Sequence, residues 1–383
     1  MNRPLSFYIH IPYCVKRCGY CDFNTYTPGE LKAGSDIAQV SNGYIDLLIQ
    51  ESKIARSEVS TSKPISTIFF GGGTPTLMEP ADLGRVLKSL EADFGFAQDI
   101  EITIEANPDT VTKAKLNQLL ETGINRISFG MQSASSHVLK TLDRTHNPEN
   151  VIKATTWARE VGFNQVSVDL IYGTPGESIA DWDQTIDAAL ALPITHISAY
   201  ALIVENGTKL AAEVKRGEII IPDEDQTADK YLLADEKFTK AGFNWYELSN
   251  WAKAGGECRH NIAYWQGSNW WGLGPGAHSH IDGKRFWNVK HPTAYRERLI
   301  SSASPIMDSE LLSDSEKESE RVMLEIRLPE GISKSSVTSA ALLRLESYLT
   351  GGQLSAQDWE LGRISLTLSG RLMADRIVRE ILL

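Results

Sequence analysis

The chain has 383 residues, of which 42% are hydrophobic and 23% charged, as is usual for soluble globular proteins. This length suits one large α/β barrel with appended parts, or two to three smaller domains. The net charge of −11 argues against a general nucleic-acid-binding protein, because little positive charge is left to neutralise phosphates. We expect no transmembrane helix and no secretory signal, and therefore a cytoplasmic protein with reduced cysteines.

The first predicted element is a strand over residues 5–11, and a cysteine-rich loop follows it. Cys14, Cys18 and Cys21 are spaced C-x3-C-x2-C. In a reducing compartment such thiols are more often metal ligands or redox groups than disulfide partners. A structural zinc site needs four protein ligands, whereas an iron–sulfur cluster held by three cysteines leaves one iron open to a substrate. The spacing favours the cluster over a zinc loop or three incidental thiols.

Strand and helix patterns then alternate through the first half of the chain. Apolar runs rich in Ile, Val, Phe and Tyr predict buried parallel strands at 5–11, 65–72, 101–107, 126–132, 165–173 and 196–203. Apolar residues at i, i+3, i+4 spacing predict helices at 44–55, 83–94, 113–123, 151–162 and 181–192. Six βα units indicate a partial (β/α)6 barrel, although a doubly wound sheet would give a similar pattern.

Polar and glycine-rich segments follow several of these strands. They are GGGTP at 71–75, EANP at 105–108, GMQ at 130–132 and DLIYGTP at 169–175. In a parallel barrel the functional residues lie at the carboxyl ends of the strands. Each segment alone also fits an ordinary turn, so the prediction of a site depends on their combination.

The alternation fades after residue 204. A helix is predicted at 225–242, an aromatic and glycine-rich block lies at 258–280, and the polar segment 301–316 is interpreted as a linker. The tail predicts a small, mostly helical, winged-helix-like domain without a basic stripe, which favours packing or partner contact over DNA binding. We therefore expect three parts: a barrel at 1–215, a barrel-extending region at 216–300, and a linker with a small C-terminal domain at 301–383.

The cysteine motif, with an aromatic residue (Tyr20) directly before its last cysteine, resembles that of the radical S-adenosylmethionine (SAM) proteins. The resemblance implies a [4Fe–4S] cluster on Cys14, Cys18 and Cys21 and a partial six-stranded barrel. It also implies that the open iron binds the amino and carboxylate groups of SAM. One electron from the cluster would then release a 5′-deoxyadenosyl radical.

Most of the chain is similar to the oxygen-independent coproporphyrinogen III dehydrogenase family of radical SAM proteins. The resemblance carries the SAM contacts of that family onto Tyr8, Tyr20, Gly72, Gly73, Thr74, Glu105, Gln132, Arg144, Asp169, Ile203 and His278. Five of these positions (Gly73, Thr74, Gln132, Arg144 and Asp169) hold a second SAM molecule in the dehydrogenase. Whether this chain binds one or two SAM molecules stays open.

The chain departs from the dehydrogenase in its cluster motif, which continues there to a fourth cysteine where this chain has Phe23. We also expect no long N-terminal extension. The block HNIAYW at 260–265 instead resembles H-N-x-x-Y-W, a hallmark of the haem-chaperone branch of the family. The resemblance implies that His260 ligates haem b, with Tyr264 and Trp265 against the porphyrin. A structural histidine in an aromatic cluster is the alternative.

These motifs are compatible with three functions, and with a metal site as an alternative to the haem site. The favoured function is a haem chaperone that delivers haem to acceptors such as membrane respiratory enzymes, with peripheral membrane contact conceivable. The alternatives are an oxygen-independent coproporphyrinogen III dehydrogenase and a radical enzyme with an unknown substrate, so enzymatic activity stays undecided. Cys258, His260, His278 and His280 could instead form a transition-metal site.

Overall fold

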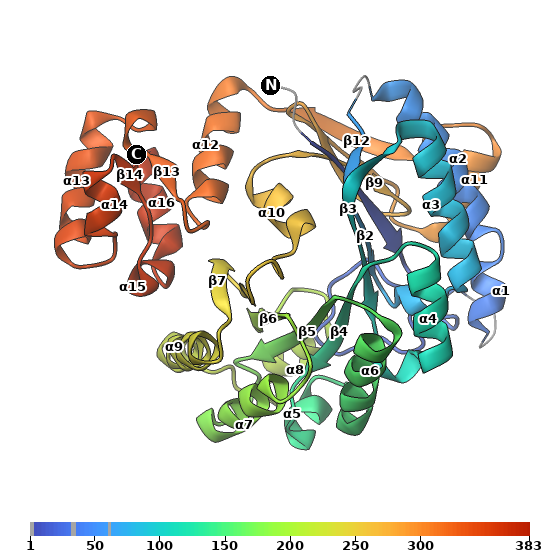
Figure 1. The fold of residues 1–383 in the computed structure, drawn as a ribbon, viewed down its shortest axis with the longest axis horizontal. Helices are drawn as coiled ribbons and strands as arrows, with labels where there is room; N and C mark the ends of the chain where they lie inside the picture. Colours follow the sequence, from blue (N-terminus) through green and yellow to red (C-terminus); the bar gives the residue numbers. More distant parts are fainter. Residues whose placement is uncertain (1–3, 32–35, 60–62) are drawn as a thin grey trace.

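The computed structural model describes residues 4–31, 36–59 and 63–383, and its backbone is shown in Figure 1. The strands are β1 Leu5–Ile11, β2 Ile65–Gly72, β3 Phe96–Ala106, β4 Arg126–Gln132, β5 Gln165–Tyr172, β6 His196–Ala201, β7 Asn244–Glu247, β8 Asn250–Ala252, β9 Asn269–Leu273, β10 His278–Ile281, β11 Lys284–Asn288, β12 Ile306–Leu311, β13 Ile332–Ser333 and β14 Arg363–Ile364. In the described residues the first twelve form one sheet, in the order β12-β11-β10-β9-β1-β2-β3-β4-β5-β6-β8-β7.

The helices are α1 Ile37–Ser41, α2 Tyr44–Glu58, α3 Pro80–Phe94, α4 Lys113–Glu121, α5 Ser136–Thr141, α6 Pro148–Val161, α7 Ile179–Leu190, α8 Lys209–Lys215, α9 Glu224–Lys240, α10 Arg259–Trp265, α11 Pro292–Ile300, α12 Asp314–Glu325, α13 Ser339–Thr350, α14 Ala356–Glu360, α15 Leu368–Arg371 and α16 Ala374–Leu382. Figure 1 shows α2, α3, α4, α6 and α7 on the outer face of the curved sheet. Helix α10 lies on the inner face and contacts β2.

Strands β1 to β6 are parallel and neighbour one another in chain order, which confirms the predicted barrel strands. Their apolar side chains pack under the outer helices, and Phe7, Ile68, Phe70 and Ile104 are fully buried. Burial of these apolar surfaces is the main stabilising contribution to the barrel. Because the connections are helical crossovers, the carboxyl ends of all six strands meet at one rim.

The sheet continues beyond the six predicted strands at both ends. Strand β9 pairs in parallel with β1, and β10, β11 and β12 follow it in antiparallel pairs. The hairpin β7–β8 pairs antiparallel with β6 at the other end. The interpretation of 301–316 as a linker is therefore wrong for Ile306–Leu311. These strands are short, and β12 is mostly exposed, so their stability comes from pairing with neighbouring strands rather than from an apolar pattern of their own.

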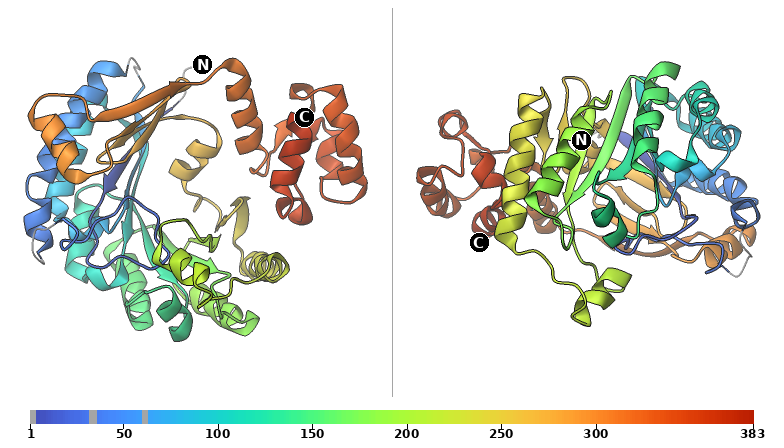
Figure 2. Two further views of the ribbon diagram at one scale, coloured as in Figure 1. Left: turned by 180° about the vertical axis from the view of Figure 1, so that it is seen from behind. Right: turned by 90° about the horizontal axis from the view of Figure 1, so that it is seen from below.

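The C-terminal residues form a small, mostly helical unit with a two-stranded ribbon, β13–β14. Its apolar core is separate from that of the barrel and includes Ile326, Leu345 and Ile377. Figure 2 shows this unit beside the barrel, where Arg371 pairs with Asp235 of α9 at 2.7 Å. Helix α12 begins at a capping box formed by Ser313 and Glu316. Among the described residues, no helix combines the length and apolar character needed to cross a bilayer.

Candidate functional site

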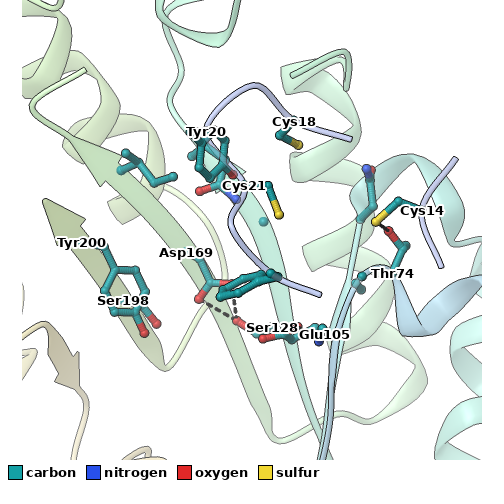
Figure 3. Close-up of a pocket in the computed structure, with 18 of the residues that line it drawn as sticks. Cys14, Cys18, Tyr20, Cys21, Thr74, Glu105, Ser128, Asp169, Ser198 and Tyr200 are labelled. Carbon is teal, nitrogen blue, oxygen red and sulfur yellow. Dashed lines mark hydrogen bonds between the residues drawn. The ribbon is translucent and has the colours of Figure 1, made fainter. Parts of the chain in front are cut away.

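The loop after β1 carries the three clustered cysteines to the rim of the barrel. Its backbone folds back on itself, because the Cys14 amide donates to the carbonyl of Tyr26 and the Tyr26 amide to that of Pro12. All three thiols are free and line one cavity of about 790 Å³. Figure 3 shows the cysteines on one side of this cavity. Burial raises the pKa of the Cys14 thiol to about 11, so a bound metal would have to displace its proton.

Each thiol meets one polar side chain. The Thr74 hydroxyl donates to Cys14 Sγ at 3.9 Å, and Arg144 Nη1 donates to Cys18 Sγ at 3.5 Å. The hydroxyl of Thr25 lies 4.0 Å from Cys21 Sγ. A guanidinium beside the cysteines stabilises negative charge there, as the net negative charge of a thiolate-bound cluster requires. The donor set therefore fits an iron–sulfur cluster.

The middle of the loop is braced by α8 and by Asp143. The Gly19 carbonyl accepts from the amide of Leu210 in α8. A Cβ added to Gly19 would lie 2.8 Å from Asp143 Oδ2, and Lys209 Nζ holds that carboxylate at 2.6 Å. A side chain at position 19 would therefore displace the Asp143 carboxylate from its ion pair with Lys209.

The run of glycines at the end of β2, Gly71–Gly73, packs against the cysteine loop. Gly72 has a φ of +110°, and a Cβ there would meet the His10 ring at 2.5 Å. A Cβ on Gly73 would lie 2.5 Å from the Tyr13 carbonyl oxygen. Both glycines line the cavity, but these two contacts alone exclude a side chain.

Two acidic residues at the strand ends are buried in the wall of the cavity. Burial, reinforced by the charge of Asp169, raises the pKa of Glu105 to about 8. The amide of Gly72 donates to Glu105 Oε2 at 3.1 Å. Burial also raises the pKa of Asp169, which accepts from the Ser128 hydroxyl at 2.9 Å (Figure 3). Both carboxyl groups could accept hydrogen bonds from the amine or ribose hydroxyls of a ligand.

Helix α10 carries the HNIAYW motif along the inner wall. Its first amides are bound by a buried carboxylate, because Glu101 accepts from the amides of Arg259 at 3.1 Å and His260 at 2.9 Å. The His260 ring is 2% exposed and bonded at both nitrogens, with Thr67 Oγ1 at 2.8 Å from Nδ1 and Tyr264 OH at 2.9 Å from Nε2. Burial lowers the pKa of His260 to about 3. The imidazole is therefore neutral and fully hydrogen-bonded.

The structure brings most of the predicted residues to the main cavity. Its lining includes Cys14, Cys18, Cys21, Tyr8, Tyr20, Gly72, Gly73, Thr74, Glu105, Gln132, Arg144, Asp169, Ile203, His260 and Tyr264. Two predicted residues, Trp265 and His278, do not line it. His278 lines an adjoining cavity of about 460 Å³, and the two cavities share Tyr8, Phe23, Gly72, Glu105 and Tyr264.

Several residues of the cavity wall were missed by the sequence analysis. They are polar side chains at alternate positions on neighbouring strands: Arg126 and Ser128, Ser167, and His196, Ser198 and Tyr200. The signal was present in the sequence, because these positions face the inside of the barrel at a period of two. It was overlooked because the same strands were interpreted as uniformly apolar.

The rival metal site is not assembled. Over residues 4–31, 36–59 and 63–383, no three His, Cys, Asp or Glu side chains could hold one metal ion. Cys258 instead donates to Glu101, and His280 contacts the carbonyl of Ser268. The three loop cysteines likewise do not converge on a single ion, which is compatible with ligands that bind separate corners of a cluster.

Comparisons with known proteins identify the family of this chain. The radical SAM superfamily profile matches residues 8–189. The chain is 43% identical to a protein named heme chaperone HemW of Mycobacterium tuberculosis, covering 100% of this chain and 95% of that protein. It is 35% identical to HemW of Bacillus subtilis, covering 86% and 85%. The chain belongs to the HemW family. The predicted radical SAM membership and haem-chaperone branch are thereby confirmed.

Among solved structures, coproporphyrinogen III oxidase (HemN) from Escherichia coli matches with a TM-score of 0.82. The match covers 99% of this HemW-family chain and 90% of HemN at 23% identity, so it shows the fold alone. The predicted fold class is confirmed. Membership of the radical SAM superfamily implies a [4Fe–4S] cluster and SAM, and the free thiols beside Arg144 fit such a cluster.

Proposed function

We propose that this protein is a cytoplasmic haem chaperone. It would bind haem and pass it to acceptor proteins such as membrane respiratory enzymes. The observation that carries the proposal is the 43% identity, over the whole chain, to proteins named heme chaperone HemW. The histidine and tyrosine of the HNIAYW motif also lie in the wall of the cavity that contains the cysteines. Aromatic and imidazole groups are the usual protein partners of a haem.

The cavity residues suggest how the family cofactors would be held. Cys14, Cys18 and Cys21 would bind the cluster, which supplies one-electron reducing chemistry at SAM when bound. Predicted SAM contacts that line the main cavity are Tyr8, Tyr20, Gly72, Gly73, Thr74, Glu105, Gln132, Arg144, Asp169 and Ile203. Arg144 would keep negative charge near Cys18, and the carboxyl groups of Glu105 and Asp169 would orient SAM through its amine or hydroxyl groups.

The haem ligand predicted from the sequence is His260. In this structure its Nε2 is engaged by the Tyr264 hydroxyl and its Nδ1 by Thr67. Ligation of iron through Nε2 therefore requires the bond to Tyr264 to break. Phe23, which replaces the fourth cysteine of the dehydrogenase motif, is 61% exposed and borders both cavities, so an apolar surface is available to a porphyrin.

The proposal is tested by haem binding, haem transfer and porphyrinogen turnover in parallel. The anaerobically reconstituted protein should bind haem near one equivalent, seen as a shifted Soret band. It should load a purified haem-free b-type respiratory cytochrome faster than free haem does. Given SAM, a strong reductant and coproporphyrinogen III, it should form no protoporphyrinogen while an active dehydrogenase does. Turnover above background, or no haem binding, would overturn the proposal.

A further inference from the structure

The adjoining cavity contains an accessible imidazole. This side cavity is lined by Tyr8, His10, Phe23, Asn24, Gly72, Glu105, Tyr264, Trp270, Gly276, Ala277 and His278. His278 is exposed, and its ring stacks on Trp287 with centroids 5.7 Å apart and planes 24° apart. Within the described residues, neither ring nitrogen of His278 makes a hydrogen bond. The stacking fixes the ring while a nitrogen lone pair stays available to a ligand.

The two other histidines near this cavity, His10 and His260, have both ring nitrogens in hydrogen bonds. His10 is bonded through Nδ1 to the Tyr8 hydroxyl at 3.1 Å and through Nε2 to the Asn24 carbonyl at 2.8 Å. His260 is bonded at both nitrogens, and the Thr67 hydroxyl beneath it donates to Ser6 Oγ at 2.8 Å. Thr67 therefore accepts from Nδ1–H of His260, so Nε2 accepts from Tyr264. This chain of bonds makes His260 a support for the wall.

The walls of the side cavity suit a flat aromatic metal complex. Phe23, Tyr264 and Trp270 contribute aromatic surface, and Trp270 is fixed by its Nε1–H bond to the His278 carbonyl at 3.1 Å. Lys290 is exposed and does not line the cavity, but it lies near His278: partial burial lowers the pKa of His278, and the charge of Lys290 lowers it further. Its backbone is anchored, since its carbonyl accepts from Asn24 Nδ2 at 2.8 Å. An imidazole, aromatic walls and one cation match the iron, ring and carboxylates of haem.

We infer that haem docks in the side cavity with His278 as its axial ligand and Lys290 facing a propionate; this inference rests on the proposed chaperone function. His260 then supports the partition between the two cavities and does not bind iron. Because Tyr8, Gly72, Glu105 and Tyr264 border both cavities, haem here would lie against the main cavity, which contains the other predicted SAM contacts. His278, which the family resemblance assigned to SAM, would then bind haem instead.

The test is a spectroscopic titration of the full-length protein with haemin. We expect His278→Ala to weaken haem binding by at least about tenfold. Loss of a residue that only orients a metal ligand lowers metal affinity by about 10–100-fold, and loss of the ligand itself should lower it at least as much. The histidine-ligated Soret band should be lost, and added imidazole should restore it by entering the space left by the side chain. His137→Ala, which removes an exposed histidine lining neither cavity, is the matched control.

A second variant keeps the assignment falsifiable without disturbing the core. Tyr264→Phe frees Nε2 of His260 while retaining the ring, so it should leave affinity and spectrum unchanged if His278 is the ligand. Tighter binding by Tyr264→Phe, or an unchanged spectrum in His278→Ala, would overturn the assignment alone. Failure of the wild-type protein to bind haem would overturn the proposed function and this assignment together.

Discussion

Two short motif-bearing segments of this molecule differ in how their side chains are used. The cysteine loop, residues 12–31, keeps its three thiols free at the rim of the main cavity. Helix α10, Arg259–Trp265, has its first amides bound by Glu101 and both nitrogens of its histidine bonded. In the sequence both motifs consist of potential ligand residues. The comparison shows that the loop is open to a ligand, whereas α10 is bound mainly to its own protein.

The largest effect is expected where a free ligand residue is removed. Cys18→Ser should abolish nearly all bound iron after anaerobic reconstitution, because only three cysteines are available to the cluster. Iron content and visible absorbance measure this. Cys258→Ser is the control, since that thiol donates to Glu101 and lies outside the loop. Equal iron content in Cys18→Ser and the wild type would contradict the loop as the cluster site.

Next in size is the loss of the anchor of α10. Glu101→Ala should lower the free energy of unfolding by about 3–5 kcal/mol, because it leaves buried Arg126, 3.9 Å away, without its countercharge. It also removes the acceptor of two helix amides. Urea unfolding measures the change. Asp99→Ala, which breaks only the exposed pair with Arg259, should change stability little. Similar curves for both variants would show that α10 is not anchored by Glu101.

A smaller, pH-dependent effect is expected at Glu105. Its pKa is raised from 4.5 to about 8, so between these pH values the folded ligand-free protein keeps a proton that the unfolded chain has lost. The stability of the wild type therefore falls as pH rises through this window. Glu105→Gln should stabilise the protein more at pH 8 than at pH 5, measured by thermal unfolding without SAM. Glu91→Gln, on the exposed face of α3, controls for the lost charge. A pH-independent difference would refute the raised pKa.

The smallest effect is expected outside the cavity. Lys209→Ala removes an exposed ion pair with Asp143, which contacts the cysteine loop at Gly19. Exposed pairs contribute little, so iron content and the half-life of the cluster should change by no more than about twofold. A larger loss would mean that the outer brace, and not only the cysteines, holds the loop in place.

Much of the barrel was predictable because its signal is local. The run from Leu5 to Ile11 and the run from Ile65 to Gly72 are apolar enough to be recognised as buried strands, and both were predicted with correct bounds. Strands such as β8 and β10 have three or four residues, and β12 is an exposed edge. They exist through pairing with neighbouring strands, and β9 and β8 attach these additions to β1 and β6, which are distant in sequence. A pattern within each short segment does not encode that pairing.

The sequence by itself determined the six βα units, the cysteine loop and the family, since residue types and spacing within short segments carry that information. The tertiary structure decided which side chains remain available. The occupied nitrogens of His260 depend on Thr67, 193 residues away in the chain, and the accessible ring of His278 depends on stacking with Trp287 across a strand pair. Hydrogen bonding and burial are properties of the folded neighbourhood, so residue type alone could not distinguish these two histidines.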